Sequence, residues 1–259
     1  PIVYDFDDAI FLPNVSDANR FIVSLKWAGK VPGIVRLSAR VIAGNDFLAD
    51  FARRHNHSVV TIPTCVDTDK FMPRTDGLGG RPPLVIGWIG SPTTASYLSM
   101  LAGVFRSVYA DTPFQVKVSG AASDVVFAGV PIANAPWSLA DEVSLFNTCD
   151  VGVYPLTDDE WSKGKCGFKA IQFMACGVPV VASAVGENVA IIEDGVNGFL
   201  AATPAEWESK LHRLLTDAPL RARIAAAGRR TVEERYSLRV CAPRVAAVFD
   251  DAIASGRPL

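Results

Sequence analysis

Short, continuous runs of Val and Ile alternate with helical stretches along almost the whole chain. A strand covered on one face alternates apolar and polar residues, whereas a strand buried on both faces is apolar throughout. The pattern therefore predicts an α/β fold with a doubly wound parallel sheet. The predicted strands are Ile2–Phe6, Val41–Ala43, Val59–Ile62, Leu84–Ile89, Phe114–Ser119, Val151–Tyr154 and Pro179–Ala182.

Helical stretches separate these strands and dominate the end of the chain. Residues Met72–Pro83 are rich in Gly and Pro and poor in apolar residues, which predicts a boundary between a short α/β part and a full-sized one. The full-sized part ends near Ala202, and the chain after it is nearly all helical. The predicted helices are Asp46–Arg54, Thr93–Tyr109, Leu139–Thr148, Phe168–Cys176, Glu206–Leu215, Arg221–Tyr236 and Val240–Ala254.

Composition excludes several classes of protein. Hydrophobic residues make up 49% of the 259, enough for a buried core, and a net charge of -2 gives no footprint for nucleic-acid binding. The five cysteines lack the spacing of a zinc site, so we expect reduced thiols and no metal. No apolar run is long enough for a transmembrane helix. Because the chain opens at Pro1 directly on an apolar strand, we expect a fragment or a processed chain.

A glycine-containing turn follows the strand predicted at Leu84–Ile89. Gly90 lets the backbone approach a ligand closely, Ser91 can cap a helix, and Pro92 suits its first turn. A helix N-terminus there would offer unpaired N–H groups to an anion, so the turn is a candidate diphosphate cradle. The turn has neither GxGxxG nor P-loop spacing, and an ordinary strand-to-helix turn stays open as the alternative.

Three lysines lie at or just before the start of the helix predicted at Phe168–Cys176; they are Lys163, Lys165 and Lys169. Positive charge at a helix N-terminus opposes the helix dipole, and this arrangement makes sense if an anion lies between the lysines and the helix. Lys169 and Gln172 lie three residues apart, so we expect them on one polar face that is separate from the apolar face. A solvated basic loop ahead of an amphipathic helix is the alternative.

A second turn follows the next buried strand and contains Gly186, Glu187 and Asn188. The helix before that strand ends at Gly177, which fits a left-handed cap. In open parallel sheets, ligands bind beyond the carboxyl ends of the strands. We therefore expect the turn at Gly90, the lysines and the turn at Gly186 to face one crevice.

Three carboxylates, Asp5, Asp7 and Asp8, lie at or just beyond the end of the first predicted strand. Clustered carboxylates at a strand end can hold Mg²⁺, but capping and solvation of a loop are the favoured explanation. We assign them no role, and we assign none to the three histidines.

The order of these segments resembles that of retaining GT-B glycosyltransferases of family 4, the glycosyl transferases group 1. Nearly the whole chain takes part, through Val60–Asp67, Ile86–Pro92, Cys149–Leu156, Lys165–Ser183 and Glu193–Leu200. The resemblance implies a chain that lacks further acceptor-domain strands before Pro1, and hence an N-terminally truncated one. It also implies a partial acceptor-side α/β segment at 1–75, a linker at 76–83, a Rossmann-like donor domain at 84–238 and a helix at 239–259 packed back on the N-terminal part.

Members of this family bind a nucleotide diphosphate sugar in the C-terminal domain and transfer the sugar to an acceptor. By resemblance, Lys165 and Lys169 are catalytic because they neutralise charge on the leaving diphosphate. Gln172 stands where many relatives carry the second Glu of an E-x7-E motif, and Gly164 stands where the first Glu would contact the donor sugar. The residues implied in donor binding are Gly90, Ser91, Trp137, Gly167, Phe168, Gln172, Gly186, Glu187 and Asn188.

We therefore expect a hexosyltransferase-like enzyme that uses a UDP- or GDP-linked sugar, without a further cofactor, in polysaccharide or glycoconjugate synthesis. The expected partners are the nucleotide sugar and a sugar or lipid-linked acceptor, in the cytoplasm or at the inner membrane surface with peripheral membrane contact. We expect this chain alone to transfer sugar inefficiently. Two alternatives stay open: a non-catalytic nucleotide-sugar-binding or assembly module with a GT-B-like core, and a nucleotide-sugar 2-epimerase.

Overall fold

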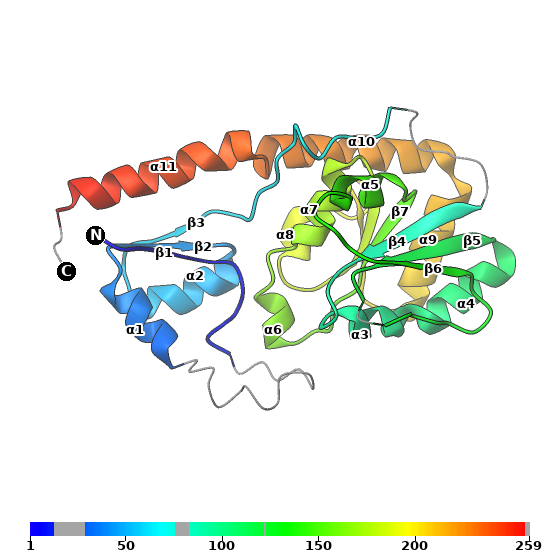
Figure 1. Cartoon of the computed structure of the whole chain (residues 1–259), viewed down its shortest axis with the longest axis horizontal. Coiled ribbons are helices and arrows are strands. Elements are labelled where there is room, and N and C mark those ends of the chain that lie inside the picture. The colour runs from blue at the N-terminus through cyan, green and yellow to red at the C-terminus, as the bar shows by residue number, and fades with distance from the viewer. Residues whose placement is uncertain (13–28, 76–82, 122, 257–259) are drawn as a thin grey trace.

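Two separate parallel sheets lie at the two ends of the molecule in the computed structural model, which describes residues 1–12, 29–75, 83–121 and 123–256 (Figure 1). The small sheet has the order β1-β2-β3, formed by Val3–Phe6, Arg40–Ala43 and Val59–Thr61. The large sheet has the order β6-β5-β4-β7-β8-β9. Its strands β4 to β9 are Leu84–Ile89, Phe114–Ser119, Ile132–Ala135, Val151–Tyr154, Val180–Ser183 and Phe199–Ala201.

Helices cover both sheets and connect them. The small sheet carries α1 (Lys30–Leu37) and α2 (Asp46–Arg53). The large sheet carries α3 to α9, with a 3-10 turn at Ser99–Leu101; these helices are Ala95–Leu98, Ala102–Asp111, Glu142–Asn147, Glu160–Lys163, Phe168–Ala175, Asn188–Ile191 and Pro204–Thr216. Two long helices, α10 (Ala218–Arg235) and α11 (Leu238–Ala254), follow one another along the length of the molecule (Figure 1).

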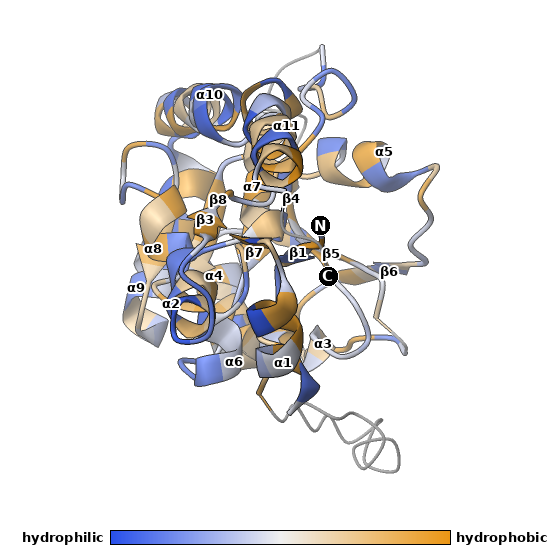
Figure 2. Ribbon diagram, turned by 90° about the vertical axis from the view of Figure 1, so that its left-hand side faces the viewer, coloured by the Kyte–Doolittle hydropathy of each residue, from blue (hydrophilic) through white to orange (hydrophobic). Residues whose placement is uncertain are grey.

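Hydrophobic packing on both faces of the large sheet explains why its strands read as continuous apolar runs. One core cluster packs β4, β5 and β7 against α4 and α9 and includes Phe105, Phe114 and Leu211. The other packs the sheet against α5 and α7 and includes Phe146 and Phe173, whose rings meet edge to face at 4.8 Å. Figure 2 shows hydrophobic residues along the strands and hydrophilic residues on outer helices such as α10.

The strand order reverses next to β4, and this reversal determines where a ligand can bind. From β4 the chain first adds β5 and β6 on one side, and then returns to add β7, β8 and β9 on the other. The connections on the two sides leave in opposite directions, which opens a crevice at the carboxyl ends of β4 and β7. Gly90 follows β4 and Pro155 follows β7, so both lie at this crevice.

Helix α11 joins the small sheet to the rest of the molecule. Cys241 and Val248 of α11 pack in one cluster with Ile42 and Ile62 of the small sheet. The Arg40 guanidinium also pairs with the Asp251 carboxylate at 2.5 Å. These contacts attach the last helix to the first part of the chain.

Most predicted strands are found within one or two residues of their predicted bounds, but several elements differ from expectation. The helix predicted at Thr93–Tyr109 is divided into α3, a 3-10 turn and α4. Strands β6 and β9 and helices α1, α6 and α8 were not predicted. Both missed strands lie at an edge of the sheet and are short, so their apolar pattern is weak. Residues 76–82 of the predicted linker lie outside the described residues.

Candidate functional site

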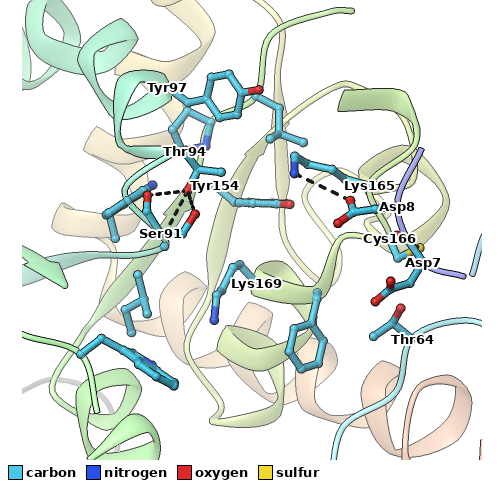
Figure 3. A pocket seen from close by; sticks show the side chains of 17 residues that line it. Asp7, Asp8, Thr64, Ser91, Thr94, Tyr97, Tyr154, Lys165, Cys166 and Lys169 are labelled. Carbon is cyan, nitrogen blue, oxygen red and sulfur yellow. Dashed lines mark hydrogen bonds and ion pairs between the residues drawn. The ribbon is translucent and has the colours of Figure 1, made fainter. Parts of the chain in front are cut away.

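A cavity of about 420 Å³ lies between the two sheets, at the reversal point of the large one. The small-sheet part contributes Asp7, Asp8 and Thr64 to its wall. The large-sheet part contributes six residues singled out from the sequence, namely Gly90, Ser91, Trp137, Lys165, Phe168 and Lys169. Figure 3 shows Ser91 and Thr94 on one side of this pocket, Asp7 and Asp8 on the other, and Lys169 between them.

The turn after β4 brings backbone and hydroxyl groups to the pocket, but it differs from the predicted helix cap. Helix α3 begins at Ala95, so Ser91 is not its N-cap. The Ser91 hydroxyl instead lies 2.9 Å from that of Thr93, and the Ser91 N–H donates to the Thr94 hydroxyl at 3.0 Å. The turn therefore presents a row of hydroxyl groups ahead of the helix.

Lys169 lies in the first turn of α7 and points toward the pocket (Figure 3). Its ammonium donates to Gln172 Oε1 at 2.6 Å and lies 3.8 Å from Glu142 Oε1. Burial lowers the pKa of Lys169, and the Glu142 carboxylate opposes that shift. The expected common face of Lys169 and Gln172 is observed, but Gln172 is 1% exposed, so the polar face of the helix is not separate from the buried one.

Lys165 crosses toward the small-sheet part of the pocket. Its ammonium lies 3.9 Å from Asp8 Oδ1 and 5.6 Å from the centre of the Trp161 ring. Burial raises the pKa of Asp8, and Lys165 opposes that effect. The pocket therefore contains lysines and carboxylates from two separate parts of the chain. Within the described ranges, no group of three or more His, Cys, Asp or Glu side chains could hold a metal ion.

The two sheets meet closely at the segment that carries the lysines. A Cβ atom on Gly164 would collide with the Ala9 Cβ and would lie 3.2 Å from the Ala9 nitrogen. The Asn45 amide donates to the Lys165 carbonyl at 3.2 Å, and the Cys166 thiol donates to the Asp7 carbonyl at 3.1 Å. Position 164 therefore has no room for a side chain, which gives a steric reason for glycine there.

Five of the residues proposed for donor binding are not among the residues that line the pocket: Gly167, Gln172, Gly186, Glu187 and Asn188. Gly167 and Gly186 adopt left-handed backbone conformations, with φ of +66° and +54°. A Cβ on Gly186 would lie 2.9 Å from the Lys163 Cα, so this turn packs beneath the lysine segment. The Gly186 turn therefore contacts the lysine segment, and its place in the same crevice stays a prediction.

Glu187 and Asn188 occupy the border between the two sheets. Burial and the nearby Asp46 raise the pKa of Glu187 to about 7, and Arg235 opposes that shift. The Asn188 amide nitrogen donates to the Ser183 carbonyl at 3.0 Å, while its buried oxygen has no hydrogen-bond partner among the described residues. Glu187 is half-buried and Asn188 is buried at this border, and their part in donor binding stays a prediction.

Several pocket residues were not predicted from the sequence. They include Thr64, Thr94, Tyr97 and Tyr154. Tyr154 could have been predicted from the sequence, because it is the last residue of a buried strand whose carboxyl end borders the crevice. Glu142 could not have been predicted, since it contacts Lys169 and Gln172 only because α5 packs beside α7.

Comparison of sequences relates this chain to known glycosyltransferases. Residues 101–217 match the family model of the glycosyl transferases group 1. The D-inositol 3-phosphate glycosyltransferase of Stackebrandtia nassauensis is 35% identical over 111 residues, which are 42% of this chain and 24% of the relative. The protein of the same name from Frankia alni is 45% identical over 62 residues, or 23% of this chain and 15% of the relative. These matches span a quarter or less of the relatives' length.

Comparison of structures extends the likeness to both sheets. Sucrose-phosphate synthase from Thermosynechococcus elongatus matches with a TM-score of 0.74 and 16% identity, over 98% of this chain and 68% of that one. Anabaena HepE, crystallised with UDP-glucose, matches with a TM-score of 0.70 and 18% identity, over 97% of this chain and 72% of that one.

The two comparisons confirm the class predicted from the sequence. The fold, with two parallel Rossmann-like sheets and a pocket between them, is that of GT-B glycosyltransferases. Residues 101–217, somewhat less than half of the chain, match the glycosyl transferases group 1, and the sequence relatives that share this likeness are named glycosyltransferases.

Proposed function

We propose that this pocket binds a nucleotide diphosphate sugar and that the protein transfers the sugar to an acceptor. The observation that carries the proposal is the meeting of Lys165 and Lys169 with the Gly90 turn at the reversal point of the large sheet. In this proposal residues 84–238 form the donor domain and residues 1–75 form the acceptor side. A UDP- or GDP-linked donor and retention of anomeric configuration follow from the family resemblance.

The chemistry of the pocket wall suits a diphosphate. Lys169 is partly buried, with 24% of its side chain exposed, so its charge is poorly screened by water. The Ser91 and Thr94 hydroxyls lie across the pocket, where they could donate to phosphate oxygens (Figure 3). A lysine that stabilises the charge developing on the leaving diphosphate would lower the barrier to transfer. Trp137, 45% exposed at the rim, offers an aromatic face to a nucleotide base.

The relatives support the same ligand class. Anabaena HepE was crystallised with UDP-glucose, and sequence relatives are named D-inositol 3-phosphate glycosyltransferase. We extend to this chain only the nucleotide sugar as a class, in polysaccharide or glycoconjugate synthesis. The acceptor, a sugar or a lipid-linked sugar, is proposed by family resemblance. No helix within the described ranges is long and apolar enough to cross a bilayer, and peripheral membrane contact stays a proposal.

Thermal unfolding with a panel of nucleoside diphosphates tests the proposal. At a ligand concentration 100-fold above Kd, binding stabilises a protein by about 2.7 kcal/mol, which raises the Tm of a chain of this size by roughly 5–10 °C. Lys169→Met should abolish most of that rise. Lys163→Met is the matched control, because Lys163 pairs with Glu160 at 3.0 Å and does not line the pocket. If no nucleoside diphosphate raises the Tm of the folded wild type, the proposal is wrong.

A second candidate is a binding or assembly module that holds the nucleotide sugar without transferring it. Gly164 favours this candidate, because by family resemblance it stands where a glutamate would contact the donor sugar, and glycine offers no carboxylate. Gln172 favours it as well, since its amide is buried and bonded to Lys169 and Glu142. Donor hydrolysis by the protein, lost in Lys169→Met and kept in Lys163→Met, would decide for the enzyme. Nucleotide binding without hydrolysis or transfer to any offered acceptor would decide for the module.

A further inference from the structure

Glu142 is a buried carboxylate that the proposed chemistry does not use. It opens helix α5, and only 7% of the residue is exposed. Carboxylates are rarely buried to this extent unless a positive charge or hydrogen bonds compensate for lost hydration. Its partners therefore indicate what it does.

The partners of Glu142 converge on Lys169. Glu142 Oε1 accepts a hydrogen bond from the Gln172 amide at 3.1 Å, and Gln172 Oε1 accepts one from the Lys169 ammonium at 2.6 Å. The same Oε1 lies 3.8 Å from the Lys169 ammonium. Gln172 is 1% exposed, so it has no room to adopt another rotamer freely. The three side chains form a closed triangle behind the pocket.

Two aromatic rings flank the ammonium and leave it open toward the pocket. The Lys169 nitrogen lies 5.5 Å from the centre of the Phe146 ring and 5.7 Å from that of Phe168. Phe146 belongs to the same short helix as Glu142 and is fully buried. Helix α5 thus supplies a carboxylate and an aromatic face to one lysine of the pocket.

We propose that Glu142 is a positioning residue for the donor site, which holds the Lys169 ammonium in place through Gln172 and keeps it protonated for a nucleotide diphosphate. This inference rests on the proposed function. A second cation, Lys70, lies 3.9 Å from Glu142 Oε2 and is 45% exposed, so it competes for the carboxylate from the solvent side. The lowered pKa of Lys169 agrees with this arrangement, because burial favours loss of the proton and Glu142 opposes it.

Other titratable groups near Lys169 must be considered in any pH dependence. The pocket wall also contains Asp7, Asp8, Tyr97, Tyr154, Lys165 and Cys166. Asp8 faces Lys165 at 3.9 Å rather than Lys169. Burial raises the pKa values of Tyr154 and Cys166, which keeps both neutral when Lys169 loses its proton. A variant at Glu142 changes none of these side chains, and of the two cations that contact Glu142, Lys169 lines the pocket whereas Lys70 does not.

The test is the proton affinity of Lys169 in the whole chain with Glu142→Gln. Lysine-labelled protein gives the Lys169 pKa by NMR titration, with Lys169→Arg assigning the signal. Loss of an opposite charge at this distance should lower that pKa by about one unit or more. Glu142→Asp, which keeps the charge, should give an intermediate value. Glu160→Gln is the control, since Glu160 pairs with Lys163 outside the pocket.

The second readout is the affinity for UDP and GDP from pH 7 to pH 10. Dividing the affinity of the variant by that of the wild type at each pH cancels the titration of the nucleotide itself. For Glu142→Gln this affinity ratio should fall about tenfold as pH rises through the Lys169 pKa. An unchanged Lys169 pKa together with a flat ratio overturns the role of Glu142, while wild-type binding leaves the proposed function standing. Absence of wild-type binding overturns both. If Glu142→Gln does not fold, Glu142→Asp decides by the same two measurements.

Discussion

Glu187 offers a sharp test of the border between the two sheets, because its pKa is raised to about 7. Burial is the main cause, and the nearby Asp46 adds to it. In the unfolded chain the pKa of this carboxyl is 4.5, so the folded state binds the proton more tightly. Such a group contributes its full stability to the fold at pH values below 4.5. The stability is lost as pH rises through about 7, since the folded protein must then bury a charge.

Replacing Glu187 by Gln removes that charge and keeps the shape of the side chain. The full shift corresponds to about 3 kcal/mol, and partial exposure to solvent reduces the expected gain to about 1–3 kcal/mol at pH 8.5. For a chain of this size the gain raises the Tm by roughly 2–10 °C. At pH 5 the wild-type carboxyl is largely protonated in the fold, so the variant should gain little there.

Thermal unfolding of wild type and Glu187→Gln at pH 5 and pH 8.5 measures this difference. Glu193→Gln is the control, because Glu193 is exposed and follows the same segment. A Tm gain for Glu187→Gln that is equal at the two pH values would refute the reasoning, since it could not come from an ionised carboxylate. A loss of Tm at pH 8.5 would show that Glu187 is paired rather than isolated at the border.

Three further predictions concern the contact between the sheets and the pocket. Gly164→Ala should lower stability by about 1–3 kcal/mol in denaturant unfolding, because its Cβ collides with Ala9, and adding Ala9→Gly should restore part of the loss. Asn45→Ala should cost about 1–3 kcal/mol in the same assay, since the side chain caps α2 and also bonds to the lysine segment. The pKa of Lys169 is lowered, so nucleotide binding measured by calorimetry should weaken at a pH below the pKa of an ordinary lysine. In Lys169→Arg, whose guanidinium keeps its charge, binding should persist to higher pH.

The central strands of the large sheet could be predicted from the sequence because they are largely buried on both faces. Val151–Tyr154 and Leu84–Ile89 are found at their predicted bounds, since a continuous run of apolar, largely buried residues marks the strand in the sequence. The missed strand Ile132–Ala135 lies at the edge of the sheet and is largely half-exposed, so its four residues carry no such pattern. The helix predicted at Thr93–Tyr109 begins two residues later, after the hydroxyl contacts of Ser91, Thr93 and Thr94, and the 3-10 turn at Ser99–Leu101 divides it.

Only those site residues could be predicted whose place in the pocket follows from the topology of the large sheet. Gly90, Lys165 and Lys169 meet in the pocket because they follow strands or begin helices at one edge of the large sheet. Glu142 and Asp8 could not be assigned in this way. Their positions depend on how α5 packs beside α7 and how the small sheet packs against the large one, and no local pattern encodes either contact.

The central claim is that the pocket between the two sheets binds the diphosphate of a nucleotide sugar. A structure of the protein with UDP or GDP tests it most directly. We expect the diphosphate beside the Gly90 turn, with phosphate oxygens within hydrogen-bond distance of the Lys169 ammonium and of the Ser91 or Thr94 hydroxyl. A nucleotide bound elsewhere on the chain, or bound in the pocket with Lys169 still engaged only by Gln172 and Glu142, would contradict the account.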